Sequence, residues 1–246
     1  MRQIAIAFAA AGLVLAAPLH AEPSVIESAV AASSRSETNK ALDESRQPAA
    51  ILEFAGISRG EVVADFMAGG GYFTEMIAEL VGKNGRVYGI NPSGFHDAAA
   101  WAVLTRTHSN VRPVPVAPKA MVIAPGSVDT IFAHLVFHDL YWESEQYKFP
   151  RLDVEMMLAN WYAGVKSGGS VVVVDHYGPG GDAREITAKL HRIDPARVIS
   201  DMTKAGFVLE AQSDVLRRSD DDQFKNVFDP EIRGKTDRFM MKFRKQ

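Results

Sequence analysis

The chain has 246 residues, 47% of them apolar, with 27 Lys and Arg residues against 30 Asp and Glu residues. One globular domain of ordinary size with a substantial core fits these numbers. The net charge of -3 argues against nucleic acid as a main partner, and the lack of cysteine excludes disulfides, zinc-thiolate sites and a cysteine nucleophile.

The N-terminal residues 1–21 have the pattern of a secretory signal peptide. Arg2 supplies a positive charge, an apolar run extends from Ile4 to Ala17, and Leu19 to Ala21 resembles a cleavage site. The apolar run is shorter than the ~20 residues that span a bilayer, so no stable membrane anchor is expected. We therefore expect export to the periplasm.

Residues 22–58 form a predicted N-terminal helical segment that precedes the main domain, residues 59–246. The stretch from Ser33 to Arg46 is mostly charged or small. Pro48 suits the first turn of a helix, and Gly56 follows where that helix would end. Packing as a solvated helix at a sheet edge is one interpretation of this segment.

The most informative stretch is a predicted strand, glycine turn and helix between Glu61 and Val81. Val62 to Phe66 is a short apolar run rich in β-branched residues, typical of a buried parallel strand. From Phe73 the apolar residues recur with helical spacing. The glycines at 69, 70 and 71 lack Cβ atoms, so a ligand can approach the N–H groups of the helix start. The pattern predicts a nucleotide-type site, with a tight turn that binds no ligand as the alternative.

The glycine turn discriminates between two classes of nucleotide site. The third glycine of a dinucleotide turn is replaced by Thr74, which disfavours NAD. The turn instead resembles motif I of class I S-adenosylmethionine (SAM) dependent methyltransferases, with Met67 in place of the motif's first glycine. The resemblance implies that SAM is the cofactor and is held by Asp65, Met67, Ala68, Gly69, Gly70, Gly71, Tyr72 and Asn91.

The cofactor cradle departs from the family pattern in two places. Asn91 follows the predicted strand Arg86–Ile90, where these methyltransferases usually carry an acid that holds the ribose hydroxyls. Its amide can still accept one hydrogen bond and donate another. A second acid, which family members often have near Ala117 for the adenine amine, is also missing.

The rest of the chain alternates between predicted strands and helices. Strands are predicted at Val111–Val116, Val128–Ala133 and Ser170–Val174, with later strands starting at Gly206 and covering Arg238–Arg244. A helix over residues 150–166 is expected to bury Leu152, Met156, Ala159 and Ala163 and to end at Gly168. The alternation predicts an α/β fold: a doubly wound, Rossmann-like seven-stranded sheet with a C-terminal antiparallel hairpin, as in class I methyltransferases.

Two pairs of polar residues follow neighbouring predicted strands. His138 and Asp139 come after the fourth strand, and Asp175 and His176 end the fifth. Because the carboxyl ends of parallel strands meet at the ligand crevice, we expect these four residues to converge on one pocket. We predict that they are the catalytic residues, with an imidazole as general base.

A divalent cation is the alternative use of these four side chains. Two carboxylates and two imidazoles could bind a metal, or they could form hydrogen-bonded Asp-His pairs. The metal-free pairs are favoured, because the metal sites of related methyltransferases use mainly oxygen ligands. No metal is therefore predicted.

From about Glu37 onward the chain resembles a family of exported bacterial proteins described as predicted methyltransferases. The resemblance rests on Gly69–Thr74, His191–Pro195 and Arg233–Phe239. It implies an exported SAM-dependent methyltransferase that acts on a small molecule, with the N-terminal segment closing over the cofactor edge. Two alternatives stay open. One is an exported protein that binds a ligand without turning it over, since SAM is expected in the cytoplasm, and the other is a metal-dependent enzyme that does not use SAM.

Overall fold

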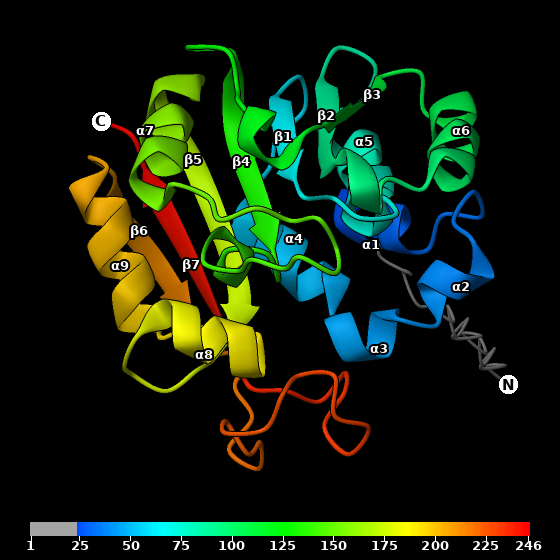
Figure 1. Ribbon diagram of the computed structural model, residues 1–246. Coiled ribbons are helices and arrows are strands. Elements are labelled where there is room, and N and C mark those ends of the chain that lie inside the picture. Colours follow the sequence, from blue (N-terminus) through cyan, green and yellow to red (C-terminus); the bar gives the residue numbers. More distant parts are fainter. Residues whose placement is uncertain (1–23) are drawn as a thin grey trace, which may run out of the picture.

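The computed structural model describes residues 24–246, and the expected signal peptide over residues 1–21 lies outside them (Figure 1). One seven-stranded sheet has the order β3-β2-β1-β4-β5-β7-β6. The strands are β1 (Val62–Phe66), β2 (Arg86–Pro92), β3 (Val111–Val116), β4 (Val128–His134), β5 (Val165–His176), β6 (Val208–Ser213) and β7 (Arg238–Arg244). β7 runs antiparallel to both β5 and β6, and the other neighbours are parallel. The predicted fold is confirmed.

β1 marks the point where the strand order reverses. It pairs in parallel with β2 on one side and with β4 on the other. In open α/β sheets, ligands bind outside the carboxyl ends of the strands at such a switch point. The glycine turn follows β1 directly, so the topology brings it to this crevice.

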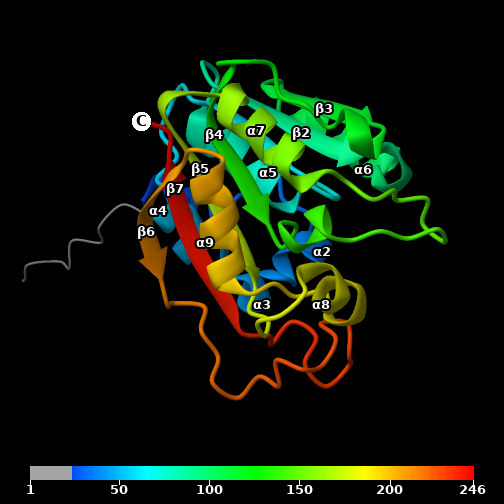
Figure 2. The same cartoon turned by 60° about the vertical axis from the view of Figure 1, so that its left-hand side comes forward.

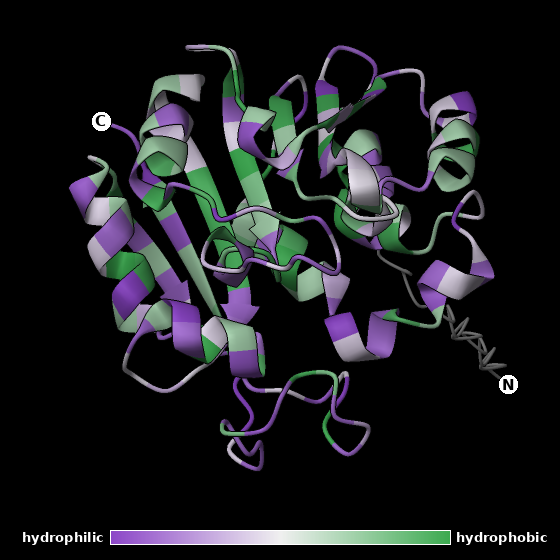
Figure 3. Ribbon diagram, in the orientation of Figure 1, coloured by the Kyte–Doolittle hydropathy of each residue, from purple (hydrophilic) through white to green (hydrophobic). Residues whose placement is uncertain are grey.

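Helices cover both faces of the sheet (Figures 1 and 2). Strand residues alternate between the faces. Val63 and Phe132 share an apolar cluster with the helices of residues 48–55, 72–81 and 98–107, whereas Ala64 and Ile131 share one with those of residues 154–164 and 195–204. Figure 3 shows apolar residues along the central strands. The helices are α1 (Val25–Val30), α2 (Glu37–Lys40), α3 (Asp43–Arg46), α4 (Pro48–Ala55), α5 (Tyr72–Val81), α6 (Ala98–Thr107), α7 (Val154–Gly164), α8 (Ala183–Leu190) and α9 (Pro195–Lys204).

The helix expected over residues 150–166 is shorter and buries a different face. α7 ends at Gly164, and β5 begins at the next residue. Met156 is 60% exposed, whereas Met157, Leu158 and Trp161 are buried. Both sets have helical spacing, and Trp161 decides between them because its ring packs edge-on against Phe66 at 4.9 Å. The expected buried face was therefore wrong.

The N-terminal segment is attached to the first turn of α5. The Arg35 side chain is buried and donates hydrogen bonds to Glu75 at 2.8 Å and to Asp43 at 2.7 Å. Ile51 and Leu52 of α4 belong to the same apolar cluster as α5. These contacts hold α3 and α4 against the helix that the glycine turn begins.

The long connection between β6 and β7 lies at the same end of the sheet as α8 (Figure 2). The buried Arg192 joins the two, because it donates hydrogen bonds to Asp221 at 2.7 and 3.0 Å. Across residues 24–246, no helix combines the length and apolar character needed to cross a membrane.

Candidate active site

A cavity of about 590 Å³ opens at the carboxyl ends of the central strands. The glycine turn, the end of β2, the segment after β4 and the end of β5 form its walls, and residues around α8 and the β6-β7 connection complete it. A volume of this size is typical of small-molecule sites. The lining residues are Met67, Gly69, Asn91, Pro92, Phe95, Leu135, Val136, His138, Asp139, Trp142, Tyr147, Phe149, His176, His191, Val227 and Phe228.

The three glycines of the turn have different environments. A Cβ atom added to Gly69 or Gly70 would meet no atom within 4 Å, so the space beside both is open. A Cβ at Gly71 would lie 2.5 Å from Leu104, and Gly71 has a φ of +84°. Gly71 therefore serves the close packing of α5 against α6 and lines neither cavity beside the turn, and its predicted contact with the cofactor stays a prediction.

Asn91 supports the glycine turn. Its Oδ1 accepts a hydrogen bond from the Gly69 N–H at 2.9 Å, and its Nδ2 donates to the Gly69 carbonyl at 3.1 Å. The Trp101 indole donates to the same carbonyl at 2.8 Å. Asn91 lines the cavity, but both ends of its amide are already bonded to the backbone. A ribose hydroxyl would have to use the second lone pair of Oδ1 or the second N–H of Nδ2.

Asp65 lies beneath the turn and does not line the large cavity. Its carboxylate is 3% exposed and accepts a hydrogen bond of 2.5 Å from Thr74 Oγ1. Burial raises the pKa of Asp65 to about 7, and the bond from Thr74 opposes this shift. Thr74, the residue that replaces the third glycine of a dinucleotide turn, thus partners the acid at the end of β1.

A smaller cavity of about 200 Å³ lies on the other side of the turn. Met67, Gly69 and Leu135 line both cavities, and Asp65, Ala68, Gly70, Tyr72, Phe73, His134 and Arg46 line only the smaller one. The Arg46 guanidinium lies 4.3 Å from the centroid of the Tyr72 ring. Within residues 24–246, no carboxylate oxygen lies within ion-pairing distance of Arg46. A cation without a bonded acid therefore faces the glycine turn.

No motif or spacing in the sequence marks Arg46 as a functional residue. It is the last residue of α3, in a stretch that reads as an ordinary solvated helix. Arg46 reaches the smaller cavity because α3 packs beside the start of α5, where Arg46 lies over the Tyr72 ring.

His138 and Asp175 form a buried pair. His138 Nδ1 lies 2.7 Å from Asp175 Oδ1, and the His138 backbone N–H donates to Oδ2 at 2.9 Å. Burial alone would lower the pKa of His138, but the carboxylates of Asp175 and Asp139 outweigh it and raise the pKa to about 9. Asp175 is fully buried and also accepts a bond from the His176 N–H. It positions its neighbours and has no exposed surface with which to touch a ligand.

Asp139 and His176 lie on the cavity wall. Burial, opposed by the charge of His138, raises the pKa of Asp139 to about 6. Burial also holds the pKa of His176 well below its usual value, although Asp175 opposes the shift. His176 Nδ1 lies 2.8 Å from Thr236 Oγ1, so its Nε2 is left for other partners. His176 is thus a neutral imidazole in a fixed orientation.

The predicted convergence on one pocket is confirmed for His138, Asp139 and His176, whereas Asp175 is buried behind His138 and does not line the cavity. The rings of His138 and His176 are 6.0 Å apart between centroids, within the size of one pocket, and both residues line the cavity. Their catalytic roles remain predictions. A third histidine joins them, with the His191 ring 5.7 Å from His138.

Sequence reasoning treated His191 only as part of a motif. His191 ends α8 in a left-handed backbone conformation, with φ and ψ both 49°. Burial and the charge of His138 lower its pKa to about 4. It follows a helix, so the rule that strand ends carry functional residues did not apply to it. Thr236, in the last motif, likewise reaches the site through His176.

Aromatic rings line the outer part of the cavity. Trp142 lies 5.2 Å from Phe149 and 5.5 Å from His191 between ring centroids, and Phe95 lies 6.1 Å from Tyr147. Phe228 packs on His191 at 5.0 Å and is 57% exposed. The cavity thus combines a polar floor of histidines and Asp139 with an aromatic entrance, which suits a flat or apolar molecule.

Comparison with known proteins identifies the architecture. A SAM-dependent methyltransferase from Aquifex aeolicus superposes with a TM-score of 0.57 at 21% identity, covering 84% of this chain and 96% of its own. One from Mesorhizobium loti gives 0.58 at 14% identity, covering 83% of this chain and all of its own. The chain has the class I methyltransferase fold. No family model and no curated protein matches its sequence.

The methyltransferase fold explains the position of the two cavities. Both adjoin the glycine turn after β1, and the larger one also reaches the end of β2 and the segment after β4. These are the carboxyl-terminal loops of a doubly wound sheet, where its ligands bind. The histidine cluster lines the larger of these two cavities.

Proposed function

We propose that this protein is an exported SAM-dependent methyltransferase that acts on a small molecule. The observation that carries the proposal is the continuity of the 590 Å³ cavity, which reaches from Gly69 in the turn to His138, Asp139 and His176. A cofactor beside the turn and an acceptor beside the histidines would share this cavity. Transfer between two bound molecules needs this proximity.

The glycine turn fits the amino acid end of the cofactor. The open space beside Gly69 and Gly70 is a place that any Cβ would fill. Arg46, which forms no ion pair among residues 24–246 although Asp43 acts on it at longer range, supplies a positive charge for a carboxylate, and Asp65 a carboxyl group for an amine. When bound, SAM supplies an electrophilic methyl group.

Recognition of the nucleoside part would rely on shape and stacking more than on hydrogen bonds. No acid follows β2, and the Asn91 amide is engaged with Gly69. Phe95 and Pro92 line this part of the cavity and offer apolar surface to a base and a sugar. We therefore expect weaker SAM binding than a ribose carboxylate would give.

His176 is the best placed general base. It lines the cavity, its Nδ1 is held by Thr236, and its lowered pKa keeps the ring neutral near pH 7. An acceptor hydroxyl or amine would lose its proton to Nε2 as it attacks. With no metal ion bound, the raised pKa keeps His138 protonated at that pH, and it then serves charge and orientation instead.

A small molecule is the proposed acceptor. The aromatic entrance and the enclosed polar floor suit a compact compound, and the net charge of -3 disfavours nucleic acid. Export rests on the signal peptide pattern of residues 1–21. N-terminal sequencing of protein from the periplasmic fraction should find a chain that begins near Glu22.

A binding protein on the same fold is the second candidate. The engaged amide of Asn91 and the missing cradle acids favour it, because both weaken the recognition of SAM. In this alternative the cavity holds another small molecule and no methyl group is transferred.

Calorimetry with SAM tests the proposal. Gly69→Val should abolish binding, because a branched side chain would fill the open space beside the turn. Gly126→Val is a matched control, since Gly126 has a φ of +59° against +56° for Gly69 and also has no atom within 4 Å of an added Cβ. Both variants place valine at a similar positive φ, but only Gly69 lies beside the cavity. A loss of binding in Gly69→Val alone is therefore an effect on the ligand site and not on folding. Heat of SAM binding to wild type and to Gly126→Val, but not to Gly69→Val, would support the proposal. No heat of binding to wild type at millimolar SAM would favour the binding protein.

A further inference from the structure

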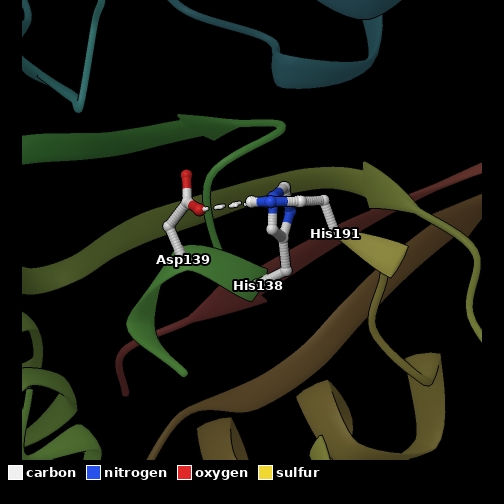
Figure 4. A group of neighbouring side chains, drawn as sticks. All are labelled: His138, Asp139 and His191. Carbon is white, nitrogen blue, oxygen red and sulfur yellow. Dashed lines mark ion pairs between the residues drawn. The ribbon is translucent and has the colours of Figure 1, made fainter. Parts of the chain in front are cut away.

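Three side chains from two segments meet on the cavity wall. His138 and Asp139 come from the turn after β4, and His191 ends α8 (Figure 4). His138 Nε2 lies 3.4 Å from Asp139 Oδ1, and His191 Nδ1 lies 3.9 Å from the same oxygen. One nitrogen or oxygen of each residue lies within 4.8 Å of the other two.

These separations are close to those of a metal site. Bonds of about 2.05 Å at tetrahedral angles place neighbouring ligand atoms about 3.3 Å apart. The shortest separation here, 3.4 Å, already matches, and the others need side-chain movements on the order of 1 Å. Asp139 and His191 are partly exposed to the cavity, so they have room for such movements.

Asp175 orients His138 as a ligand. A metal-binding histidine usually donates its other ring N–H to a carboxylate, which fixes the tautomer and the ring. Here Nδ1 of His138 is held by the buried Asp175 at 2.7 Å, and Nε2 is the atom nearest Asp139. The sequence had suggested Asp175 as one of two carboxylates of a cation site. The structure places it behind the histidine and puts a second imidazole, His191, at the front.

His191 is held in an unfavourable backbone conformation. A residue other than glycine with φ and ψ of 49° is strained, and such strain persists where the surrounding structure fixes the residue. α8 could end in glycine without this strain. The His191 ring lies 5.7 Å from the His138 ring, and it also packs against Trp142 and Phe228.

We propose that His138, Asp139 and His191 bind one divalent transition metal ion of the zinc type on the cavity wall. Two imidazoles and one carboxylate suit Zn²⁺ and its neighbours, whereas Mg²⁺ and Ca²⁺ prefer oxygen ligands. The four residues considered from the sequence, two carboxylates and two imidazoles, are a different ligand set. In the structure His191 takes part in place of Asp175 and His176, so two of the three ligand atoms are nitrogens. Three protein ligands leave a coordination position open toward the cavity, where an oxygen of a bound molecule can fill it. The inference does not depend on SAM binding.

Protein purified without a histidine tag and stripped with a chelator provides the test. Calorimetry in the absence of SAM should show one equivalent of Zn²⁺ bound and no heat with Mg²⁺. Asp139→Ala and His191→Gln should each weaken Zn²⁺ binding at least tenfold. His108→Gln is the matched control, because His108 also lies beside a carboxylate, with Nδ1 3.4 Å from Glu79, but outside the cavity. It should bind Zn²⁺ as wild type does.

Co²⁺ provides a readout that reports on the ligands themselves. Visible absorption of the Co²⁺-loaded protein should disappear in Asp139→Ala and His191→Gln and persist in His108→Gln. Circular dichroism checks that each variant is folded. No Zn²⁺ bound by wild type at about 0.1 mM would overturn the proposal, as would equal affinities in all four proteins. Because SAM is absent, neither outcome bears on the proposed methyl transfer.

Discussion

His138 and Asp175 are joined by two bonds to one carboxylate: the ring Nδ1 lies 2.7 Å from Oδ1 and the backbone N–H donates to Oδ2 at 2.9 Å. Asp175 is the penultimate residue of β5, and His138 begins the short 3-10 helix after β4. The pair therefore ties two neighbouring strand ends together at the floor of the cavity. Its loss should change both the stability of the protein and the geometry of the site.

Asp175→Asn should destabilise the protein by about 3 kcal/mol, because removing one partner of a buried ion pair leaves the other without compensation. Urea unfolding followed by circular dichroism measures this change. Asp139→Asn is the comparison, since Asp139 is partly exposed and lies 3.4 Å from His138. It should cost less than half as much. A similar loss of unfolding free energy in both variants would show that the buried pair of His138 and Asp175 stabilises the protein no more than the contact between His138 and Asp139 does.

Asp65→Asn should stabilise the protein at alkaline pH. Burial raises the folded-state pKa of Asp65 to about 7 from 3.8, so its favourable contribution is complete below pH 3.8 and is lost as the pH rises through 7. At pH 8 the wild type has a buried charge that Asn lacks. The stability of the variant relative to wild type should rise by on the order of 2 kcal/mol between pH 5 and pH 8. Thermal unfolding at both pH values measures the difference.

The matched control for this pH effect is Asp220→Asn, an exposed acid in the β6-β7 connection. Its stability difference from wild type should not change between pH 5 and pH 8. If the stability difference of Asp65→Asn is also the same at both pH values, burial does not raise the pKa of Asp65 in the folded protein.

His191→Gly should be more stable than His191→Ala, by about 1 kcal/mol. Both variants lose the imidazole and its contacts with Phe228 and Trp142, and only glycine relieves the left-handed conformation. Denaturant unfolding of the two variants measures the difference in their stabilities, which reports the cost of the left-handed backbone conformation. Equal stabilities would mean that α8 ends in another conformation in solution.

Arg46→Gln should weaken SAM binding about tenfold, since it removes the one cation that lines the smaller cavity among residues 24–246. Calorimetry at low and high salt should show that the loss shrinks with added salt. Arg106→Gln, an exposed residue of α6, should bind SAM as wild type does. An unchanged affinity in Arg46→Gln would place the cofactor's carboxylate elsewhere.

The fold was predictable because its signals are local. Val62–Phe66 and Val171–Val174 are runs of apolar, largely β-branched residues, which are typical of strands covered on both faces. Gly69 to Gly71 follow the first run, and apolar residues with helical spacing come after them. Strand order then follows from the rules for parallel sheets. The convergence of His138 and His176 was predictable on the same ground, since both follow neighbouring strands.

Tertiary structure alone decided how these residues are used. Asn91 bonds to Gly69 across 22 positions of sequence, Asp175 is buried behind His138, and His191 reaches the site from the end of α8. Such contacts depend on which side chains are desolvated together, and no local pattern encodes that. The face that α7 buries followed the same rule, because packing of Trp161 on Phe66 chose between two faces of equal helical spacing.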